Sequence, residues 1–237
     1  MGKTCLAGIC LLALFGCATQ QGSAPAPSSL RGKTLAVTAR PQSTFEAVTP
    51  GRGLLIGATQ GFSSGGVGHA GAELVAQNQI EDPAPRLAQD LLKAAQDRQG
   101  LVAAGIPPVP VHGAEWAMQA GEPVEVQLVA AKAEDLTRAA AGADLLLDVV
   151  ASGMIAYRFP NLHRYDVRTR ISARIIDVGT GRTLVQRNCE RSSHEDPNPP
   201  SYDELVAQEA ARLKAMLAAQ RAACFEELEA GLFGIGP

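Results

Sequence analysis

The segment Gly61-Phe62-Ser63-Ser64-Gly65 has the spacing G-x-S-x-G. Hydrolases use this spacing to expose a serine nucleophile on a sharp turn between a strand and a helix. A short apolar run at residues 53–59 precedes Ser63, and His163 or His194 could supply the base. However, a nucleophile turn lies in the middle of a larger parallel sheet, and here only one or two strands can come before it. Ser63 is therefore an alternative catalytic residue, and catalysis is not the leading expectation.

Glycine density favours a different structure for this region. Residues 51–71 contain eight glycines. Each glycine costs about 1 kcal/mol in a helix, so the pattern predicts a flexible loop, with a helix over residues 72–79 only.

Two other chemistries are poorly supported by spacing. Residues 66–71 match G-x-G-x-x-G, but a dinucleotide site needs this motif directly after a strand, and six residues intervene. The four histidines are scattered without i, i+4 pairs, and no Cys-x-x-Cys occurs. We therefore expect neither a cofactor nor a metal site.

A row of arginines is the remaining candidate site. Residues 164–178 alternate strictly, which predicts a long, half-buried strand. One face carries Arg164, Arg168, Arg170 and Arg174. Guanidinium groups bind carboxylate or phosphate in pairs of hydrogen bonds, so this face could hold an anionic cell-wall ligand or an acidic partner. The favoured alternative is a solvated face neutralised by Asp166 and by helix residues such as Glu204 or Glu226.

Caps and periodicity predict the elements that would position these groups. Asp82-Pro83 starts a helix that stops at Gly100, and the capping box at residues 201–204 starts another that runs to about Leu228. Strands are expected at residues 33–39, 124–128, 143–151, 164–178 and 183–189, with a helix at residues 133–141. The fold class is therefore α/β of the α+β type: a single mixed sheet with an antiparallel C-terminal hairpin and helices packed on it.

The first seventeen residues predict a cellular location. Lys3 gives a positive start, and residues 5–15 form an apolar run too short to span a membrane. The following LFGC, ending at Cys17, resembles the lipobox of bacterial lipoprotein signal peptides. The resemblance implies cleavage after residue 16, lipidation of Cys17 and, with Ala18 next, the periplasmic face of the outer membrane. An ordinary secretory signal with an incidental cysteine is the alternative.

Cysteine arithmetic then predicts a disulfide. Cleavage before Cys17 removes Cys5 and Cys10, and lipid occupies Cys17. Cys189 and Cys224 remain in an oxidising compartment, where they should pair. Two free thiols are the less favoured alternative.

Composition narrows the function classes. The 237 residues are 46% hydrophobic and 4% aromatic, with a formal charge of −3. The apolar content supports a packed core, whereas there is neither a basic excess nor enough aromatic residues for nucleic-acid binding. The expected organisation is a signal peptide (1–16), a lipidated cysteine and flexible tether (17–32), a periplasmic domain (33–229) and a tail (230–237).

The C-terminal half resembles a group of uncharacterised proteobacterial lipoproteins. The shared motifs are IIDVGTG at residues 175–181, SYDEL at residues 201–205, and the two cysteines Cys189 and Cys224. These motifs are structural, so the resemblance implies location and fold but no catalytic residues. The expected function is that of a non-enzymatic envelope accessory or interaction module. It would contact the membrane through its lipid and act through an envelope protein or an anionic ligand, without nucleic acid.

Overall fold

The computed structural model describes residues 27–40, 44–48, 65–111, 133–158 and 161–234. Over these residues the chain forms one seven-stranded mixed sheet with helices packed on it, which confirms the predicted fold class. The elements are α1 (Pro27–Leu30), β1 (Thr34–Ala39), β2 (Thr44–Ala47), α3 (Gly65–Asn78), α4 (Pro83–Gln99), β3 (Val102–Ala103), β4 (Val109–Pro110), α6 (Ala133–Ala139), β5 (Leu145–Arg158), β6 (Asn161–Asp177), β7 (Thr183–Ser192) and α7 (Tyr202–Phe233). The apolar run at residues 53–59 and the strand expected at residues 124–128 lie outside the described residues.

The sheet is built around the long strand β5. The main order is β3-β1-β5-β6-β7, while β2 also pairs with β5 and β4 with β1. Strands β6 and β7 pair antiparallel, as the hairpin pattern predicts. Strand β5 also pairs antiparallel with β6, and the short N-terminal strands pair in parallel. Strand β1 meets residues 145–147 of β5 and β2 meets residues 152–155. The edge of β5 opposite β6 therefore receives two short strands in succession.

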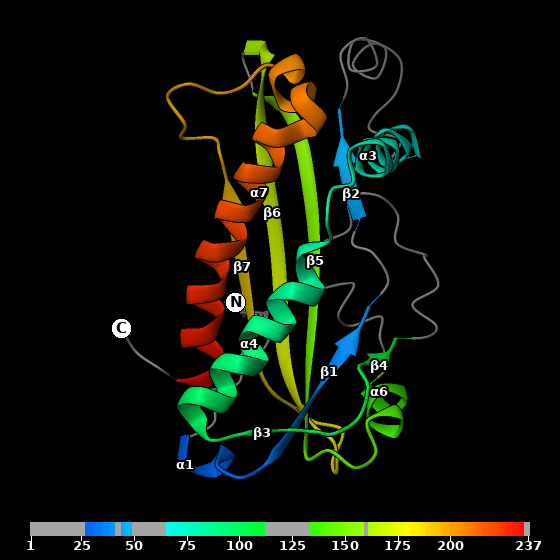
Figure 1. Ribbon diagram of the computed structural model, residues 1–237, viewed down its shortest axis with the longest axis vertical. Helices are drawn as coiled ribbons and strands as arrows, with labels where there is room; N and C mark the ends of the chain where they lie inside the picture. Colours follow the sequence, from blue (N-terminus) through cyan, green and yellow to red (C-terminus); the bar gives the residue numbers. More distant parts are fainter. Residues whose placement is uncertain (1–26, 41–43, 49–64, 112–132, 159–160, 235–237) are drawn as a thin grey trace, which may run out of the picture.

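Helices α4 and α7 cover one face of the sheet, and α3 lies beside β2 (Figure 1). Their apolar stripes pack on the sheet residues that alternate inward, such as Leu147, Ile171 and Ile175. A smaller apolar cluster forms on the opposite face, where α6 and β4 pack on Ala36, Leu146 and Ile176. Where α6 packs, the sheet is thus the middle one of three layers.

A disulfide joins the edge strand β7 to α7. The sulfur atoms of Cys189 and Cys224 are bonded, and the two Cα atoms lie 5.6 Å apart. Both residues are buried in the main core. The predicted pairing is therefore present. In the chain-entropy description, a bridge between residues 35 apart stabilises the fold by roughly 3–4 kcal/mol.

Both helix starts read from the sequence are also present. Asp82 caps α4 through its side chain, and Ser201 and Glu204 form the predicted capping box of α7. Gly100 ends α4 in the left-handed conformation, as expected.

The two ends of the described fold differ from the expected limits. Residues 27–30, assigned to the flexible tether, form α1, and Leu30 is buried in the core. Helix α7 continues past Leu228 to Phe233, and both Leu232 and Phe233 are fully buried. Residues 230–233 therefore belong to the packed core and not to a tail, because their apolar side chains continue the inner stripe of α7.

Near its start, α7 is interrupted. Ala207 is extended, and Gln208, Glu209 and Ala210 have φ between 52° and 58°. Left-handed backbone costs roughly 1–2 kcal/mol for a residue other than glycine. Leu205 before the interruption and Leu213 after it are both fully buried, so packing holds both pieces in place.

The expected flexible loop over residues 51–71 is wrong at its C-terminal end, where α3 begins at Gly65. Close packing explains why glycine is present in this helix. A Cβ atom on Gly71 would lie 1.7 Å from the backbone oxygen of Phe45 in β2. Glycine thus lets the helix rest directly on the strand, and that contact offsets the low intrinsic helix propensity.

A buried carboxylate joins the three central strands. Asp148 of β5 accepts hydrogen bonds from Arg40 at 2.8 and 2.7 Å, from Thr38 of β1 at 2.9 Å and from Arg174 of β6 at 2.9 Å. Burial alone would raise the pKa of Asp148. The hydrogen bonds and charge of Arg40, with Arg174 and Thr38, outweigh burial and hold that pKa below the ordinary value. Asp148 is therefore ionised at neutral pH and links β1, β5 and β6.

Asp148→Asn should destabilise the protein strongly, because it leaves two arginines buried without their counter-ion. We expect the free energy of unfolding to fall by about 3–5 kcal/mol at pH 7, measured by urea unfolding. The control is Asp97→Asn, which removes an exposed ion pair with Lys93. Such exposed pairs contribute about 0–1 kcal/mol.

The same variant should change the response to acid. Since the folded-state pKa of Asp148 is lowered, its stabilisation is complete above about pH 4 and is lost as pH falls through that pKa. The stability gap between wild type and Asp148→Asn should therefore narrow on acidification. A constant gap from neutral pH to about pH 3 would contradict the assignment.

Candidate functional site

A cavity of about 440 Å³ lies between α7, the start of α4 and the middle of β5 and β6. This volume is within the range of small-molecule sites. Its lining comes from β2, the end of α3, the connection into α4, the sheet and α7. The apolar part of the lining consists of Phe45, Val75, Ile80, Pro83, Leu217 and Ala218.

The floor of the cavity is set by a glycine in the sheet. Gly153 of β5 pairs across the ladder with Thr169 of β6 and, on its other side, with Phe45 of β2. A Cβ on Gly153 would lie 2.4 Å from the Phe45 ring. The missing side chain therefore allows the ring to lie against the strand at the base of the cavity.

A side-chain hydrogen bond fixes α7 above this floor. The hydroxyl of Thr169 donates to Oε1 of Gln220 at 2.6 Å, and Nε2 of Gln220 donates to the carbonyl of Val167 at 2.9 Å. Because Gln220 comes between Leu217 and Arg221 on α7, these bonds set the position of the helix wall relative to β6.

The opposite wall is formed where α3 ends and α4 begins. Gln79 is left-handed, with φ of 51°, and the amide of Ile80 donates to the carbonyl of Val75 at 3.1 Å. This bond pattern closes the end of a helix and turns the chain. Three residues later Asp82 caps α4 by accepting from the amide of Ala84 at 2.8 Å. The two helix ends thus bring residues 79–83 to the rim.

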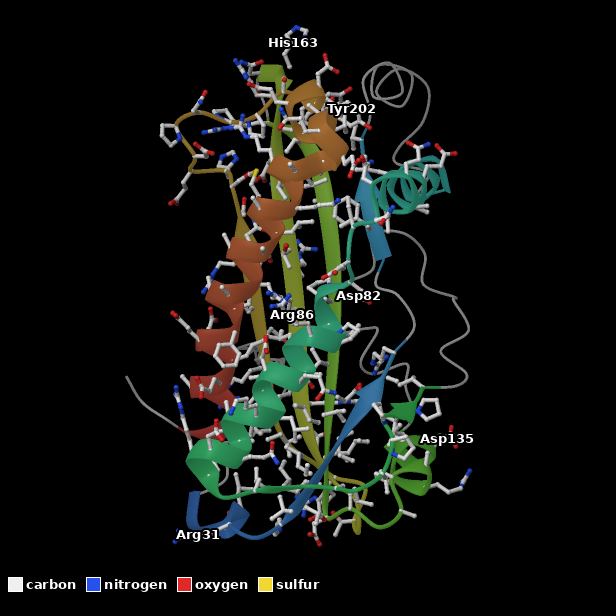
Figure 2. All side chains as sticks on the ribbon, viewed as in Figure 1. Arg31, Asp82, Arg86, Asp135, His163 and Tyr202 are labelled. Carbon is white, nitrogen blue, oxygen red and sulfur yellow. A yellow bond between two sulfur atoms is a disulfide. The ribbon has the colours of Figure 1, made fainter. Side chains whose placement is uncertain are left out.

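Three cationic side chains line the cavity. Arg86 comes from the first turns of α4, and Figure 2 shows it directed toward the space between α4 and α7. Lys214 and Arg221 come from α7, seven residues apart on one face. Among the residues that the structure describes, none of these three has a hydrogen bond or an ion pair from its side chain. Two carboxylates, those of Glu81 and Asp82, share the lining.

The arginine face predicted from the sequence is neutralised. Arg168 pairs with Asp166 and Arg164 with Glu204, the partners that the favoured alternative named. Arg170 pairs with Glu190 of the neighbouring strand β7. The expected solvated row is wrong for Arg174, because that side chain is buried against Asp148. A charged side chain of this kind becomes buried when a carboxylate on the adjacent strand faces it.

None of the other sequence-predicted groups is among the described residues that line this cavity. Ser63, Cys17 and His112 lie outside the described residues, and His69 falls within α3. His163 is exposed at the tip of the β5–β6 hairpin (Figure 2), and His194 is exposed in the loop after β7. In the described part of the chain, no three His, Cys, Asp or Glu side chains are grouped so that they could hold a metal ion.

The sequence does not predict the cavity, because its lining comes from six helices and strands and from the connection between α3 and α4. The available signal was weak: Lys214 and Arg221 flank apolar Leu217 on one helix face, next to a stripe that also reads as an ordinary core. The described lining contains two hydroxyls, Ser152 and Thr169, but no histidine or cysteine. Its chemistry is suited to binding an apolar group beside a negative charge.

Comparisons with known proteins give distant structural likenesses. No protein-family description and no curated protein matches this chain. The hypothetical protein CT253 from Chlamydia trachomatis is similar at 7% identity and a TM-score of 0.38, covering 86% of this chain and 99% of that one. Lipoprotein GNA1162 from Neisseria meningitidis is similar at 13% identity and a TM-score of 0.31, covering 82% and 99%. The LpoB C-terminal domain from Salmonella enterica is similar at 13% identity and a TM-score of 0.28, covering 70% and 87%. We draw no functional conclusion from likenesses at this level.

Gly153→Ala should destabilise the protein, because the new methyl group displaces the Phe45 ring. We expect a loss of about 1–3 kcal/mol in the free energy of unfolding, measured by urea unfolding. Gly179→Ala is the matched control, since a Cβ there would lie 3.6 Å from its nearest neighbour, in ordinary contact. Phe45→Leu should relieve the strain in the Gly153→Ala background. Equal losses for the two glycine variants would contradict this account of the floor.

Proposed function

We propose that this chain is a non-enzymatic lipoprotein of the cell envelope, anchored through Cys17 to the periplasmic face of the outer membrane. It acts as an accessory or interaction module through what its α/β domain binds. The observation that carries the proposal is the lining of the cavity, which combines apolar side chains with three cations that lack ion-pair partners among the described residues. These groups suit binding, and the part of the lining that the structure describes has no histidine or cysteine beside its hydroxyls.

The disulfide is a further observation that supports the envelope location. The described domain contains the disulfide Cys189–Cys224, a bond that persists in oxidising compartments such as the periplasm. None of the helices in the described residues combines the length and apolar character needed to cross a bilayer. The proposal assigns membrane attachment to the lipid on Cys17, which multiple acyl chains make stable.

Cys17→Ser should move the protein out of the membrane fraction, because the thiol that carries the lipid is gone. Fractionation of cells followed by mass spectrometry of the N-terminus measures this. Cys10→Ser is the matched control, since it removes a cysteine from the expected signal peptide without touching the lipid site, and its product should remain membrane-bound. Wild-type protein that stays in the membrane with an unmodified Cys17 would refute the anchoring proposal.

A fluorophosphonate probe should leave Ser63 of the purified protein unlabelled, because the proposal gives this serine no activating base. Labelling is read by in-gel fluorescence and peptide mapping, with Ser63→Ala and Ser64→Ala compared side by side. Covalent labelling that disappears in Ser63→Ala and persists in Ser64→Ala would replace the binding role with a serine hydrolase.

A further inference from the structure

We propose that the cavity between α4 and α7 binds a single-chain amphiphile with one anionic head group, a carboxylate or a phosphate. This inference rests on the proposed binding function and names the ligand class. It is carried by the placement of three cations around one apolar cavity.

The cations come from two helices and converge on the same space. Lys214 and Arg221 are separated by two turns of α7, roughly 10 Å along the axis, and Arg86 comes from α4. Other cations of these two helices are paired, including Arg98 with Glu229 and Arg212 with Glu204. Like charges held around one cavity repel each other. An anion bound among them attracts all three cations, and this attraction offsets the repulsion.

The two carboxylates of the lining limit the charge of the ligand. Asp82 and Glu81 are adjacent residues at the start of α4, and one oxygen of Asp82 is engaged by the amide of Ala84. Three positive and two negative side chains leave the lining with one net positive charge. A single anionic head group balances this charge, whereas a cationic head group would face repulsion.

The apolar groups supply a place for the chain of the amphiphile. Phe45, Val75, Ile80 and Leu217 come from four different segments and face one cavity of about 440 Å³. The Phe45 ring lies against Gly153, where no side chain fills the floor. Since a buried methylene contributes about 0.8 kcal/mol, each methylene that enters should tighten the dissociation constant about fourfold.

Binding is measured by isothermal titration calorimetry with the full chain carrying Cys17→Ser, so that neither detergent nor bound lipid competes. The ligands are decyl phosphate, decanoate, decyltrimethylammonium and inorganic phosphate, each below its micelle concentration where one exists. We expect both anionic amphiphiles to bind at one site, with the cationic amphiphile and inorganic phosphate at least tenfold weaker. The ratio between decyl phosphate and decanoate distinguishes a phosphate head group from a fatty acid.

Variants of the lining locate the binding. Replacing any one of the three cations with glutamine should weaken the affinity for decyl phosphate on the order of threefold to tenfold. The variants are Arg86→Gln, Lys214→Gln and Arg221→Gln. Arg138→Gln removes an exposed arginine of α6, paired with Asp135, and should leave binding unchanged. Ala218→Phe adds bulk to the lining at an exposed position and should abolish binding while thermal unfolding stays as in wild type.

Three outcomes would overturn the inference: binding of decyltrimethylammonium as tight as that of decyl phosphate, unchanged affinity in all four lining variants, or no binding of either anionic amphiphile. None of these outcomes affects membrane attachment through Cys17 or the lack of labelling at Ser63. Failure of the ligand class is therefore distinguishable from failure of the proposed function.

Discussion

The central sheet depends on the ion pairs and hydrogen bonds that the ionised carboxylate of Asp148 makes. Asp148 lies near the start of β5. On one side it is bonded by Thr38 of β1 and by Arg40, which directly follows that strand, and on the other side by Arg174 of β6. A buried charge has no good alternative to these partners, because any shift in strand register would leave it unpaired in a low-dielectric interior. The same contact that stabilises β1 beside β5 thus fixes which residues of each strand face each other.

The positions of the residues at the floor of the cavity depend on that register. With β5 and β6 fixed, Gly153 and Thr169 stand opposite each other, and Gln220 can hold α7 above them. The left-handed turn at Gln79 then sets the start of α4, and with it Arg86, across from α7. The mixed sheet, with α4 and α7 on one of its faces, therefore positions a charged, partly apolar cavity, and no catalytic group converges there among the described residues.

Local signals in the sequence account for most of the C-terminal half. Strict alternation over residues 164–178, the capping residues Asp82 and Ser201, and the cysteines Cys189 and Cys224 each specify structure within a few residues or by simple chemistry. The parallel pairing of β1 with β5 joins residues 110 apart and leaves no local pattern. The role of Asp148, which lies in an apolar run, could not be predicted for the same reason. Its partners are distant in the sequence and come close only when the strands pair.

The prediction of a flexible loop where α3 begins shows the limit of an argument from glycine content. Counting glycines estimates the entropy that a helix must overcome, but it says nothing about contacts that need a missing side chain. Gly71 lies so close to the backbone of Phe45 that no other residue fits without a shift. The sequence could not predict the cavity either. In the sequence alone, Arg86, Lys214 and Arg221 are typical solvated residues, and only the packing of α4 beside α7 brings them to one cavity.

The 110-residue separation between β1 and β5 has a consequence for the order in which the domain can form. The β5–β6 and β6–β7 pairings close short loops, whereas β1 must wait until β5 exists and then close a far longer one. During that interval Leu35 and Val37, which end up in the core, have no sheet to cover them. We expect the first strand to stay exposed, and open to pairing with other chains, until β5 has formed and β1 docks on it. Pulse-labelled amide exchange, with β1 protected no later than β5, would contradict that order.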